Sequence, residues 1–280
     1  MNKKRLILIL SSICVLFLMT GCSTSDELIH LDTEFSSMTH EGVLAAVLVY
    51  PLAQAINYLS VHTGVFWAIT IVATALNAII IICTFNMNVS MQKMQELQPE
   101  VQKIQLKYEG RTDDSSQQRM AAELQQLYKK NGVNPIGSLV STFIQLPVLI
   151  SMYSAVRRSA AVASGTVLGA SLSLTPKEAF IKQEWILIVI YVLMIVFQFV
   201  STNVPRWVQT ARDKKAADKR HKHYEKPANS NGVMMYSMVV LIAVLMISWP
   251  TALSLYYLIY SLINIVKTIV IDRLTHKDKE

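Results

Sequence analysis

Residues 64–87 are 24 consecutive positions without a charged side chain, and Asn77 lies in the middle of this mostly apolar segment. An amide that finds no partner in hydrocarbon costs several kcal/mol, so we expect Asn77 to face other helices or a water-filled cavity. Polar side chains inside membrane spans are candidates for functional sites. The alternative is an ordinary hydrogen bond between helices, worth about 1 kcal/mol.

The composition indicates a membrane protein that crosses the bilayer several times. Hydrophobic residues make up 52% of the chain and charged residues 16%, with a mean hydropathy of +0.36. These values exclude an ordinary soluble domain. Five stretches approach the ~20 residues that cross about 30 Å of hydrocarbon. We therefore predict an all-α membrane protein with five transmembrane helices.

Residues 1–21 resemble a bacterial lipoprotein signal peptide. Three basic residues at positions 3–5 precede an apolar run at 6–18, and Gly21 stands directly before Cys22. Cleavage at such a pattern leaves the cysteine as an N-terminus that carries acyl chains such as palmitate. The alternative is an uncleaved anchor helix that contains an incidental cysteine.

The distribution of basic residues predicts an extracellular N-terminus and a cytoplasmic C-terminus in a bacterial plasma membrane. No Lys or Arg occurs at positions 22–63, whereas residues 88–134, 206–231 and the tail from Lys267 onward are rich in them. By the positive-inside rule these three basic segments are cytoplasmic. The loop 157–184 goes against this trend with four basic residues, but it is outnumbered. The net charge of +7 indicates attraction to anionic lipid, and nucleic acid is not needed to explain it.

Residues 43–62 are uncharged but are interrupted by Pro51. If this segment crossed the membrane, the lipoprotein cysteine would be cytoplasmic, which contradicts its signal peptide. We therefore predict an amphipathic helix on the outer interface, with Gln54, Asn57 and Tyr58 towards water or headgroups. In chain order, the prediction comprises a signal peptide (1–21), an extracellular tail (22–42), an interfacial helix (43–62), a first span (64–87), a cytoplasmic helical hairpin (88–134), a second span (135–156), an extracellular loop (157–184), a third span (185–205), a basic cytoplasmic loop (206–231), a fourth span (232–249), a fifth span (251–270) and a cytoplasmic tail (271–280).

The segment 88–134 is too regularly patterned to be a simple connection. Apolar residues recur at helical spacing on both sides of a polar turn at 110–116. They are Met87, Met91, Met94, Val101 and Ile104 before the turn, and Met120, Leu124 and Leu127 after it. The two helices of this hairpin either pack only on each other or use their adaptable methionines to contact a client or partner.

Polar residues form stripes at helical spacing within four predicted spans. The stripes are Thr70, Thr74 and Asn77; Ser138, Thr142 and Gln145; Gln198 with Ser201 or Thr202; and Ser254, Tyr257, Ser261 and Asn264. Because lipid cannot accommodate these groups, the four faces should converge on a hydrophilic interior. Serine and threonine alone carry little weight, since they can bond back to their own helix.

No pattern for catalysis or cofactor binding is present in the sequence. The six histidines lie in loops, interfacial regions or tails without metal-ligand spacing, and phosphate-cradling glycine loops and nucleophile elbows are lacking. Cys14 lies in the predicted signal peptide and Cys83 in a span, so no disulfide framework is expected. We predict a protein that is not an enzyme and that needs no cofactor or metal.

Several segments resemble the YidC family of membrane protein insertases. They are residues 94–100 (MQELQPE), residues 131–135 (NGVNP), residues 145–148 (QLPV), Met234 with Met235, and residues 249–257 (WPTALSLYY). The resemblance runs from about residue 60 to about 270. The chain is similar to the lipid-anchored, five-span YidC proteins of Gram-positive bacteria.

The resemblance implies a groove that opens to cytoplasm and lipid and takes polar parts of nascent membrane proteins part-way across. Its lining positions correspond to Asn77, Gln198 and Tyr257 here. The family usually has an arginine at the position of Asn77, and often a tryptophan at that of Tyr257. Loss of the arginine removes a positive charge, yet an asparagine still offers two donors and an acceptor, so a hydrophilic groove remains possible.

The first hypothesis is therefore a membrane protein insertase and chaperone whose partners are nascent membrane proteins. Its groove would comprise Thr70, Thr74, Asn77, Gln145, Gln198, Tyr257 and Ser261. The sequence leaves open whether the ribosome or the Sec translocon is an obligatory partner. A small-solute transporter or channel with the same polar interior, and a lipid-anchored scaffold without a groove, are the alternative hypotheses.

Overall fold

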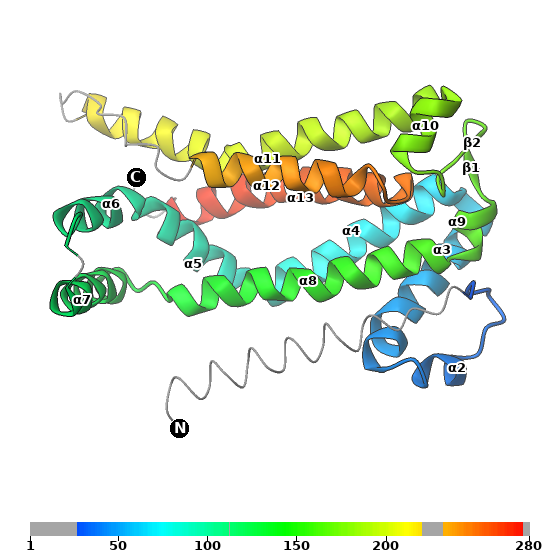
Figure 1. The fold of residues 1–280 in the computed structure, drawn as a ribbon, viewed down its shortest axis with the longest axis horizontal. Coiled ribbons are helices and arrows are strands. Elements are labelled where there is room, and N and C mark those ends of the chain that lie inside the picture. The colour runs from blue at the N-terminus through cyan, green and yellow to red at the C-terminus, as the bar shows by residue number, and fades with distance from the viewer. Residues whose placement is uncertain (1–26, 112, 220–231, 277–280) are drawn as a thin grey trace. The chain divides into compact units, whose positions relative to one another are not determined.

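The computed structural model describes residues 27–111, 113–219 and 232–276, and most of these residues are helical (Figure 1). The elements are α2 (Phe35–Thr39), the π-helix η1 (Ala45–Val49), α3 (Tyr50–Thr63), α4 (Val65–Cys83), α5 (Phe85–Glu96), α6 (Gln98–Lys107), α7 (Asp114–Lys130), α8 (Pro135–Arg158), α9 (Ala160–Ser164), β1 (Thr166–Val167), β2 (Ala170–Ser171), α10 (Pro176–Lys182), α11 (Trp185–Lys219), α12 (Gly232–Met246) and α13 (Thr251–His276). The predicted signal peptide and Cys22 lie outside the described residues.

Three helices are long and apolar enough to cross a membrane within the described part of the chain. They comprise Val65–Cys83 of α4, Trp185–Arg212 of α11 and Thr251–Thr275 of α13. The prediction of a helical membrane protein is thus confirmed. The two other predicted spans correspond to α8 and to α12, which has 15 residues. The count of five spans therefore stays a prediction.

The chain divides into two compact units, which we describe separately. The first comprises Met1–Leu76, Ile144–Ile195 and Ile242–Tyr260, and the second comprises Asn77–Phe143, Val196–Leu241 and Ser261–Glu280. Helix α4 contributes residues to both, because the division falls between Leu76 and Asn77.

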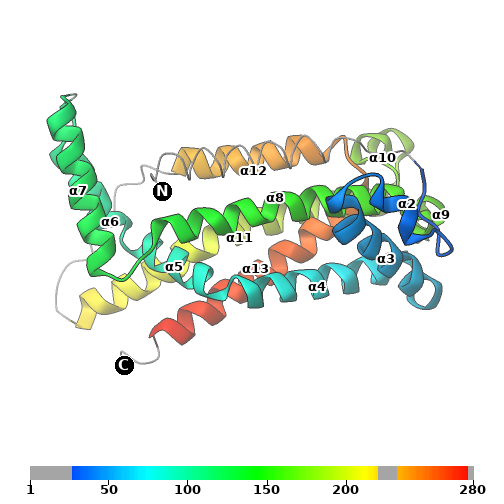
Figure 2. The same ribbon diagram turned by 90° about the horizontal axis from the view of Figure 1, so that it is seen from below.

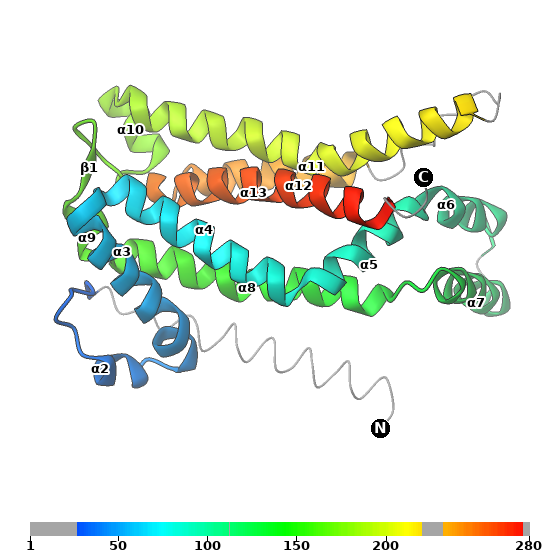
Figure 3. The same ribbon diagram turned by 180° about the vertical axis from the view of Figure 1, so that it is seen from behind.

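In the first unit, the segment after the predicted lipidation site is attached to the end of α8. Ile29 forms a parallel bridge with Ser159, in which the Ile29 N–H donates to the Arg158 carbonyl at 2.6 Å. Ile29 is 1% exposed and packs with Met38, Ala46, Val49, Ala53 and Ala155. Figures 2 and 3 show α2, α3 and α9 gathered around this small core.

Asn57 of α3 does not face water or headgroups, and that prediction is wrong. Its side chain is 3% exposed. Its amide donates to the Ile29 carbonyl at 2.6 Å, and its oxygen accepts from the Ser159 hydroxyl at 2.7 Å and the Ala161 N–H at 3.0 Å. Tyr58, in contrast, is 62% exposed, as predicted. Pro51 does not interrupt α3, because it occupies the first turn, where its missing N–H costs no helical hydrogen bond.

The loop between α8 and α11 is folded rather than irregular. Strands β1 and β2 pair antiparallel, and a capping box formed by Thr175 and Glu178 starts α10 (Figure 1). The N–H groups of Thr251 and Ala252 donate to the carbonyls of Leu174 and Leu172 at 2.9 and 3.0 Å. The loop thereby satisfies donors at the start of α13 that have no partner within their own helix.

In the second unit, Pro99 determines where α5 gives way to α6. It lies in the first turn of α6, and α5 ends at Glu96, because a proline has no N–H to donate to the carbonyl four residues earlier and its ring crowds that carbonyl. Helix α11, in contrast, continues through Pro205 to Lys219. It is therefore longer than the predicted third span, 185–205.

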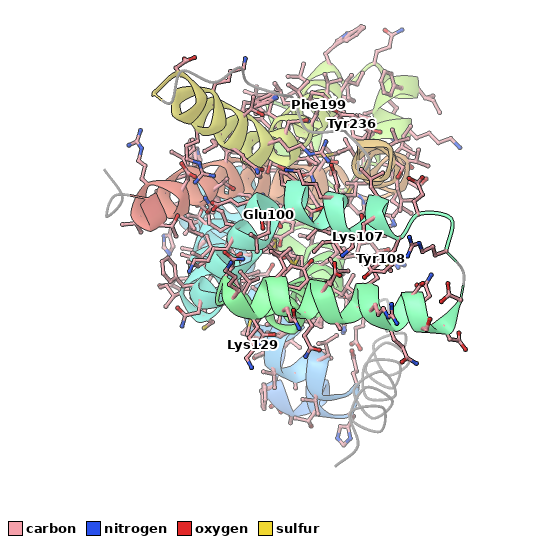
Figure 4. The ribbon with its side chains drawn as sticks, turned by 90° about the vertical axis from the view of Figure 1, so that its left-hand side faces the viewer. Glu100, Lys107, Tyr108, Lys129, Phe199 and Tyr236 are labelled. Carbon is pink, nitrogen blue, oxygen red and sulfur yellow. The ribbon has the colours of Figure 1, made fainter. Side chains whose placement is uncertain are left out.

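Helices α6 and α7 pack against each other within the predicted cytoplasmic hairpin. Lys107 and Tyr108, at the end of α6, both donate to the Glu123 carboxylate of α7, at 2.6 and 2.8 Å (Figure 4). Asp113 caps α7 by accepting from the Ser116 N–H at 2.9 Å. Hydrogen bonds from Ser115 and Ser116 lower the pKa of the Asp113 carboxyl to about 2.

Candidate functional site

The buried face of α4 continues into α5 in the second unit, and it is polar. Asn77 is 3% exposed, Thr84 3% and Asn88 7%. The i to i−4 backbone bonds continue across the junction, since the Thr84 N–H donates to Ile80 and the Asn88 N–H donates to Thr84, each at 2.9 Å. The three side chains, seven and four residues apart, therefore share one helical face.

Asn88 connects this face to α13. Its amide nitrogen donates to the Thr84 carbonyl at 3.0 Å and to the Thr84 hydroxyl at 2.9 Å. These two bonds fix the orientation of the side chain, so that its oxygen accepts from Lys267 Nζ of α13 at 3.3 Å. A lysine inside a candidate membrane span is thus held by a neutral amide.

Helices α11 and α13 are joined by two hydrogen bonds between polar side chains. The Ser261 hydroxyl donates to Gln198 Oε1 at 2.6 Å, and the Asn264 amide donates to the Ser201 hydroxyl at 2.9 Å. Both pairs use positions three residues apart on their helices. Gln198 and Ser261 therefore hold the helices together. We call the four residues of the two pairs, Gln198, Ser201, Ser261 and Asn264, the α11–α13 seam.

Arg212 joins three helices at one end of the second unit. Its guanidinium lies 3.0 Å from the Glu96 carboxylate of α5 and 3.0 Å from the Asp272 carboxylate of α13. Gln92 of α5 also donates to Asp272, at 2.9 Å. A cavity of about 10 Å³ adjoins this network, which is room for one water molecule.

On α11, an aromatic contact lies beside the seam. The ring of Phe199 stacks on Tyr236 of α12 at a centroid distance of 5.8 Å, and the Tyr236 hydroxyl donates to Asn203 at 3.4 Å (Figure 4). Asn203 is itself only 4% exposed. This contact attaches α12 to α11 within the second unit.

Four predicted groove residues belong to the first unit. Thr70 and Thr74 donate to carbonyls of their own helix at 2.8 and 2.7 Å, and Thr74 is exposed. Tyr257 is 6% exposed and packs edge-on against Tyr256 at a centroid distance of 5.6 Å. The nitrogen of Gln145 is buried without a hydrogen-bond partner among the described residues.

The other members of the Gln145 stripe are Ser138 and Thr142. Both lie on α8, but their side chains are outside the part of the chain that the structure describes. The hydroxyls of Thr70 and Thr74 bond back to their own helix, which serines and threonines can do without any partner from another helix. Among the threonine and glutamine positions of the first unit, Gln145 thus has the strongest need for an external partner.

Sequence reasoning missed the charged members of the second unit. The charge count groups Lys267 with the basic tail, although the predicted fifth span, 251–270, contains it and it continues the stripe of Ser261 and Asn264 by another three residues. That spacing is the signal that places it on the seam face. Arg212 gave no such signal, because its two carboxylate partners lie 116 and 60 residues away in the chain.

Comparison with known proteins confirms the predicted family. Residues 57–279 match the family model described as the 60Kd inner membrane protein. The chain is 30% identical to the membrane protein insertase MisCA of Bacillus subtilis over 271 residues, which cover 96% of this chain and 92% of that protein. It is 31% identical to the membrane protein insertase YidC 1 of Streptococcus pyogenes serotype M6 over 244 residues, or 83% and 79% of the two chains.

A third relative extends this similarity along nearly the whole chain. The membrane protein insertase YidC 2 of Bacillus anthracis is 26% identical over 274 residues, which are 96% of this chain and 94% of that protein. The matched region includes α4, α5, α11 and α13, which carry Asn77, Asn88, the seam and Lys267. The chain therefore belongs to the YidC family of membrane protein insertases.

Proposed function

We propose that this protein inserts nascent membrane proteins into the bilayer and acts as their chaperone. The observation that carries the proposal is the buried polar face of the second unit, which runs from α4, a helix long enough to span a membrane, into α5 in a chain of the insertase family. Asn77, Thr84 and Asn88 are buried there on one face, and such groups are costly in a membrane unless a function retains them.

A hydrophilic interior would act by lowering the barrier for polar parts of a client. A polar client loop that contacts amides and hydroxyls avoids the full cost of entering hydrocarbon. Apolar client segments gain by leaving towards lipid, since burial of apolar area is favourable at about 25 cal/mol per Å². The protein would thus work by solvating one part of its client and releasing the other.

Water is part of this proposal. Gln145 Nε2 and the hydroxyls of Ser151 and Ser254 are buried in the first unit and lack partners among the described residues. A buried polar group without a partner costs about 1–3 kcal/mol, and water is the partner that a hydrated interior supplies. These three groups therefore support hydration of the protein interior.

We also propose that Cys22 carries the lipid anchor outside the cell and that the C-terminus is cytoplasmic. Arg158 is one of the four basic residues that oppose this orientation, and it makes two hydrogen bonds to the Glu41 carboxylate and one to the Glu27 carbonyl. These contacts support the same side of the membrane for its loop and for the N-terminal tail that carries Glu41.

Site-specific crosslinking tests the proposed function. A photoreactive residue at position 77 or 198 should crosslink to a ribosome-bound single-span client, while one at Ile79, which is 60% exposed, should crosslink to lipid. Crosslinks to lipid alone from all three positions would contradict the insertase proposal.

The transporter hypothesis makes a different prediction. It requires solute flux into proteoliposomes that stops when position 77 is blocked. The seam argues against it, because the Gln198 oxygen accepts from Ser261 and the Ser201 hydroxyl accepts from Asn264, so these two oxygens bond a neighbouring helix rather than a solute.

A further inference from the structure

The turn between β1 and β2 carries an exposed leucine in an unfavourable conformation. Val167 pairs with Ala170, so Leu168 and Gly169 alone form the turn. Their φ angles are +49° and +89°, as a type I′ turn requires, and such turns favour asparagine, aspartate or glycine before the glycine. A leucine is disfavoured in this region because its Cβ crowds the backbone.

Packing within the protein does not explain this leucine either. Leu168 is 87% exposed, the largest exposure of any large apolar side chain in the part of the chain that the structure describes. A residue that suits neither its local conformation nor its surroundings points to a function. For an apolar side chain, that function is contact with an apolar partner outside the protein.

Helix α10 presents two further apolar side chains at the same end of the first unit. Phe180 and Ile181 are exposed, Ile181 at 75%, while Ala179 is fully buried. The hairpin of β1 and β2 and helix α10 both lie where α11 begins (Figures 1 and 3). The exposed apolar groups of this loop are therefore gathered at one end of the unit.

Hydrogen bonds at both ends fix the orientation of α10. The Lys177 N–H donates to the Ile247 carbonyl at 3.3 Å. At the other end Gln183 adopts the left-handed conformation, and the Glu184 N–H donates to the Ala179 carbonyl at 2.9 Å. The exposure of the apolar side chains of α10 is therefore a property of the fold.

The start of α11 places this apolar surface at the membrane interface. Trp185 is the first residue of the candidate span Trp185–Arg212, and its side chain is exposed. Tryptophan is enriched where a span meets the headgroups. The bond from Glu184 to Ala179 turns the chain back, so that α10 ends beside Trp185. We call the four exposed residues the outer apolar patch: Leu168, Phe180, Ile181 and Trp185.

The charges around α10 cancel. Lys177 and Lys182 are accompanied by Glu178 and Glu184, and the Glu178 carboxylate accepts from the N–H and the hydroxyl of Thr175 at 2.8 and 2.9 Å. A selective contact with anionic headgroups would need an excess of cations. The burial of apolar area is therefore the force that would hold a partner here.

We propose that the outer apolar patch inserts into the boundary between the headgroups and the acyl chains of the outer leaflet, in the orientation proposed above. Interfacial segments bury apolar side chains to this depth, while lysines extend back towards water. The partner is lipid because the patch is continuous with the exposed start of a span, which lipid surrounds in the membrane. This contact requires α11 to cross the bilayer and goes beyond the insertase function.

Site-specific photocrosslinking in bacterial membranes tests the proposal on the full chain. A benzophenone-bearing amino acid at position 168 or 181 should form adducts with phospholipid, which their mass identifies. The matched control is position 173, because Ser173 is exposed on the same loop but polar, and it should give no lipid adduct. Adducts with a client, with another protein or with a second copy of the chain, in place of lipid, would contradict the proposal.

Fluorescence in proteoliposomes gives an independent measurement. Leu168→Trp and Ser173→Trp each add one tryptophan to the four of the chain. Phospholipids with bromine on their acyl chains should quench the added emission of Leu168→Trp and not that of Ser173→Trp. Replacement of phosphatidylglycerol by phosphatidylcholine should leave this difference unchanged, since the charges around α10 cancel.

Two results of these measurements would overturn the proposal. If the quenching of Leu168→Trp disappears in phosphatidylcholine vesicles, a charged headgroup holds the loop rather than apolar burial. If position 168 forms no lipid adduct and Leu168→Trp is quenched no more than Ser173→Trp, the patch lies in water.

Discussion

Arg158 in the first unit and Lys267 in the second are both cations withdrawn from solvent, yet their surroundings differ. Arg158 is 4% exposed and makes two hydrogen bonds to the Glu41 carboxylate. Lys267 is half-buried and has a neutral amide as its partner. The first cation is fully used in holding the structure together, whereas the second keeps binding capacity. The contrast separates a structural charge from one available to a ligand.

The same contrast applies to the amides. Asn57 of the first unit uses both its nitrogen and its oxygen on three partners from the preceding and following segments. Asn88 of the second unit is fixed through its nitrogen and offers its oxygen to a cation. We expect substitution of Arg158 to act on stability, and substitution of Asn77 to act on insertion.

The largest effect is expected from Arg158→Ala, which removes the guanidinium from the Glu41 carboxylate, a group that is 18% exposed. Loss of one partner of a buried ion pair should lower the free energy of unfolding by about 3 kcal/mol. Thermal unfolding in detergent measures this change, and the exposed neighbour Arg157 provides the control variant Arg157→Ala. An unchanged unfolding temperature would show that the Arg158 pair is not structural.

Asn77→Leu should impair function rather than folding. Removing the central amide of the buried face should slow insertion of acidic and neutral clients alike by roughly fivefold, the rate effect of about 1 kcal/mol. Ala78→Leu introduces the same side chain at the adjacent exposed position and should have no such effect. Normal insertion by the Asn77→Leu variant would refute both the hydration and the charge-attraction accounts of this position.

Asn77→Arg places the residue usual in the family on the buried polar face and tests whether a charge there adds to hydration. For clients with acidic outer tails we expect less than about a twofold change, since the buried amides already make this face hydrophilic. Folding of the variant also tests hydration, because a buried arginine costs about 2.5–3.5 kcal/mol unless water reaches it.

The outcomes of this arginine variant distinguish the hydration account from the charge-attraction account. A large gain for acidic clients would mean that charge attraction, and not hydration alone, governs insertion. A gain for neutral clients would mean that charge attraction is not the relevant effect of the arginine.

The smallest effect is expected at the seam, where Ser261 and Gln198 satisfy each other. A double-mutant cycle with Ser261→Ala and Gln198→Leu should give a coupling free energy of about 0.6 kcal/mol, typical of hydrogen bonds between membrane helices. The unfolding free energies of the four variants measure it. A coupling near zero would show that the bond between Gln198 and Ser261 does not stabilise the protein.

Much of the architecture follows from local sequence patterns. Hydropathy and length predict α4, α11 and α13 as candidate spans, and the motifs at residues 94–100 and 249–257 predict the family. The stripe of Ser261 and Asn264 also predicts one polar face of α13 correctly. These features depend on residues close in sequence, which periodicity reports directly.

Only the tertiary structure shows which residues these polar faces contact. Asn57 was predicted to face water because its helix is amphipathic, but Ile29 and Ser159 enclose it. The ion pair of Arg158 with Glu41 joins residues 117 apart, and the bond of Lys267 to Asn88 joins residues 179 apart. Periodicity shows which face of a helix is polar but not which residues that face contacts. Those contacts determine whether a buried charge is neutralised. They come from segments distant in sequence, so only the tertiary structure decided them.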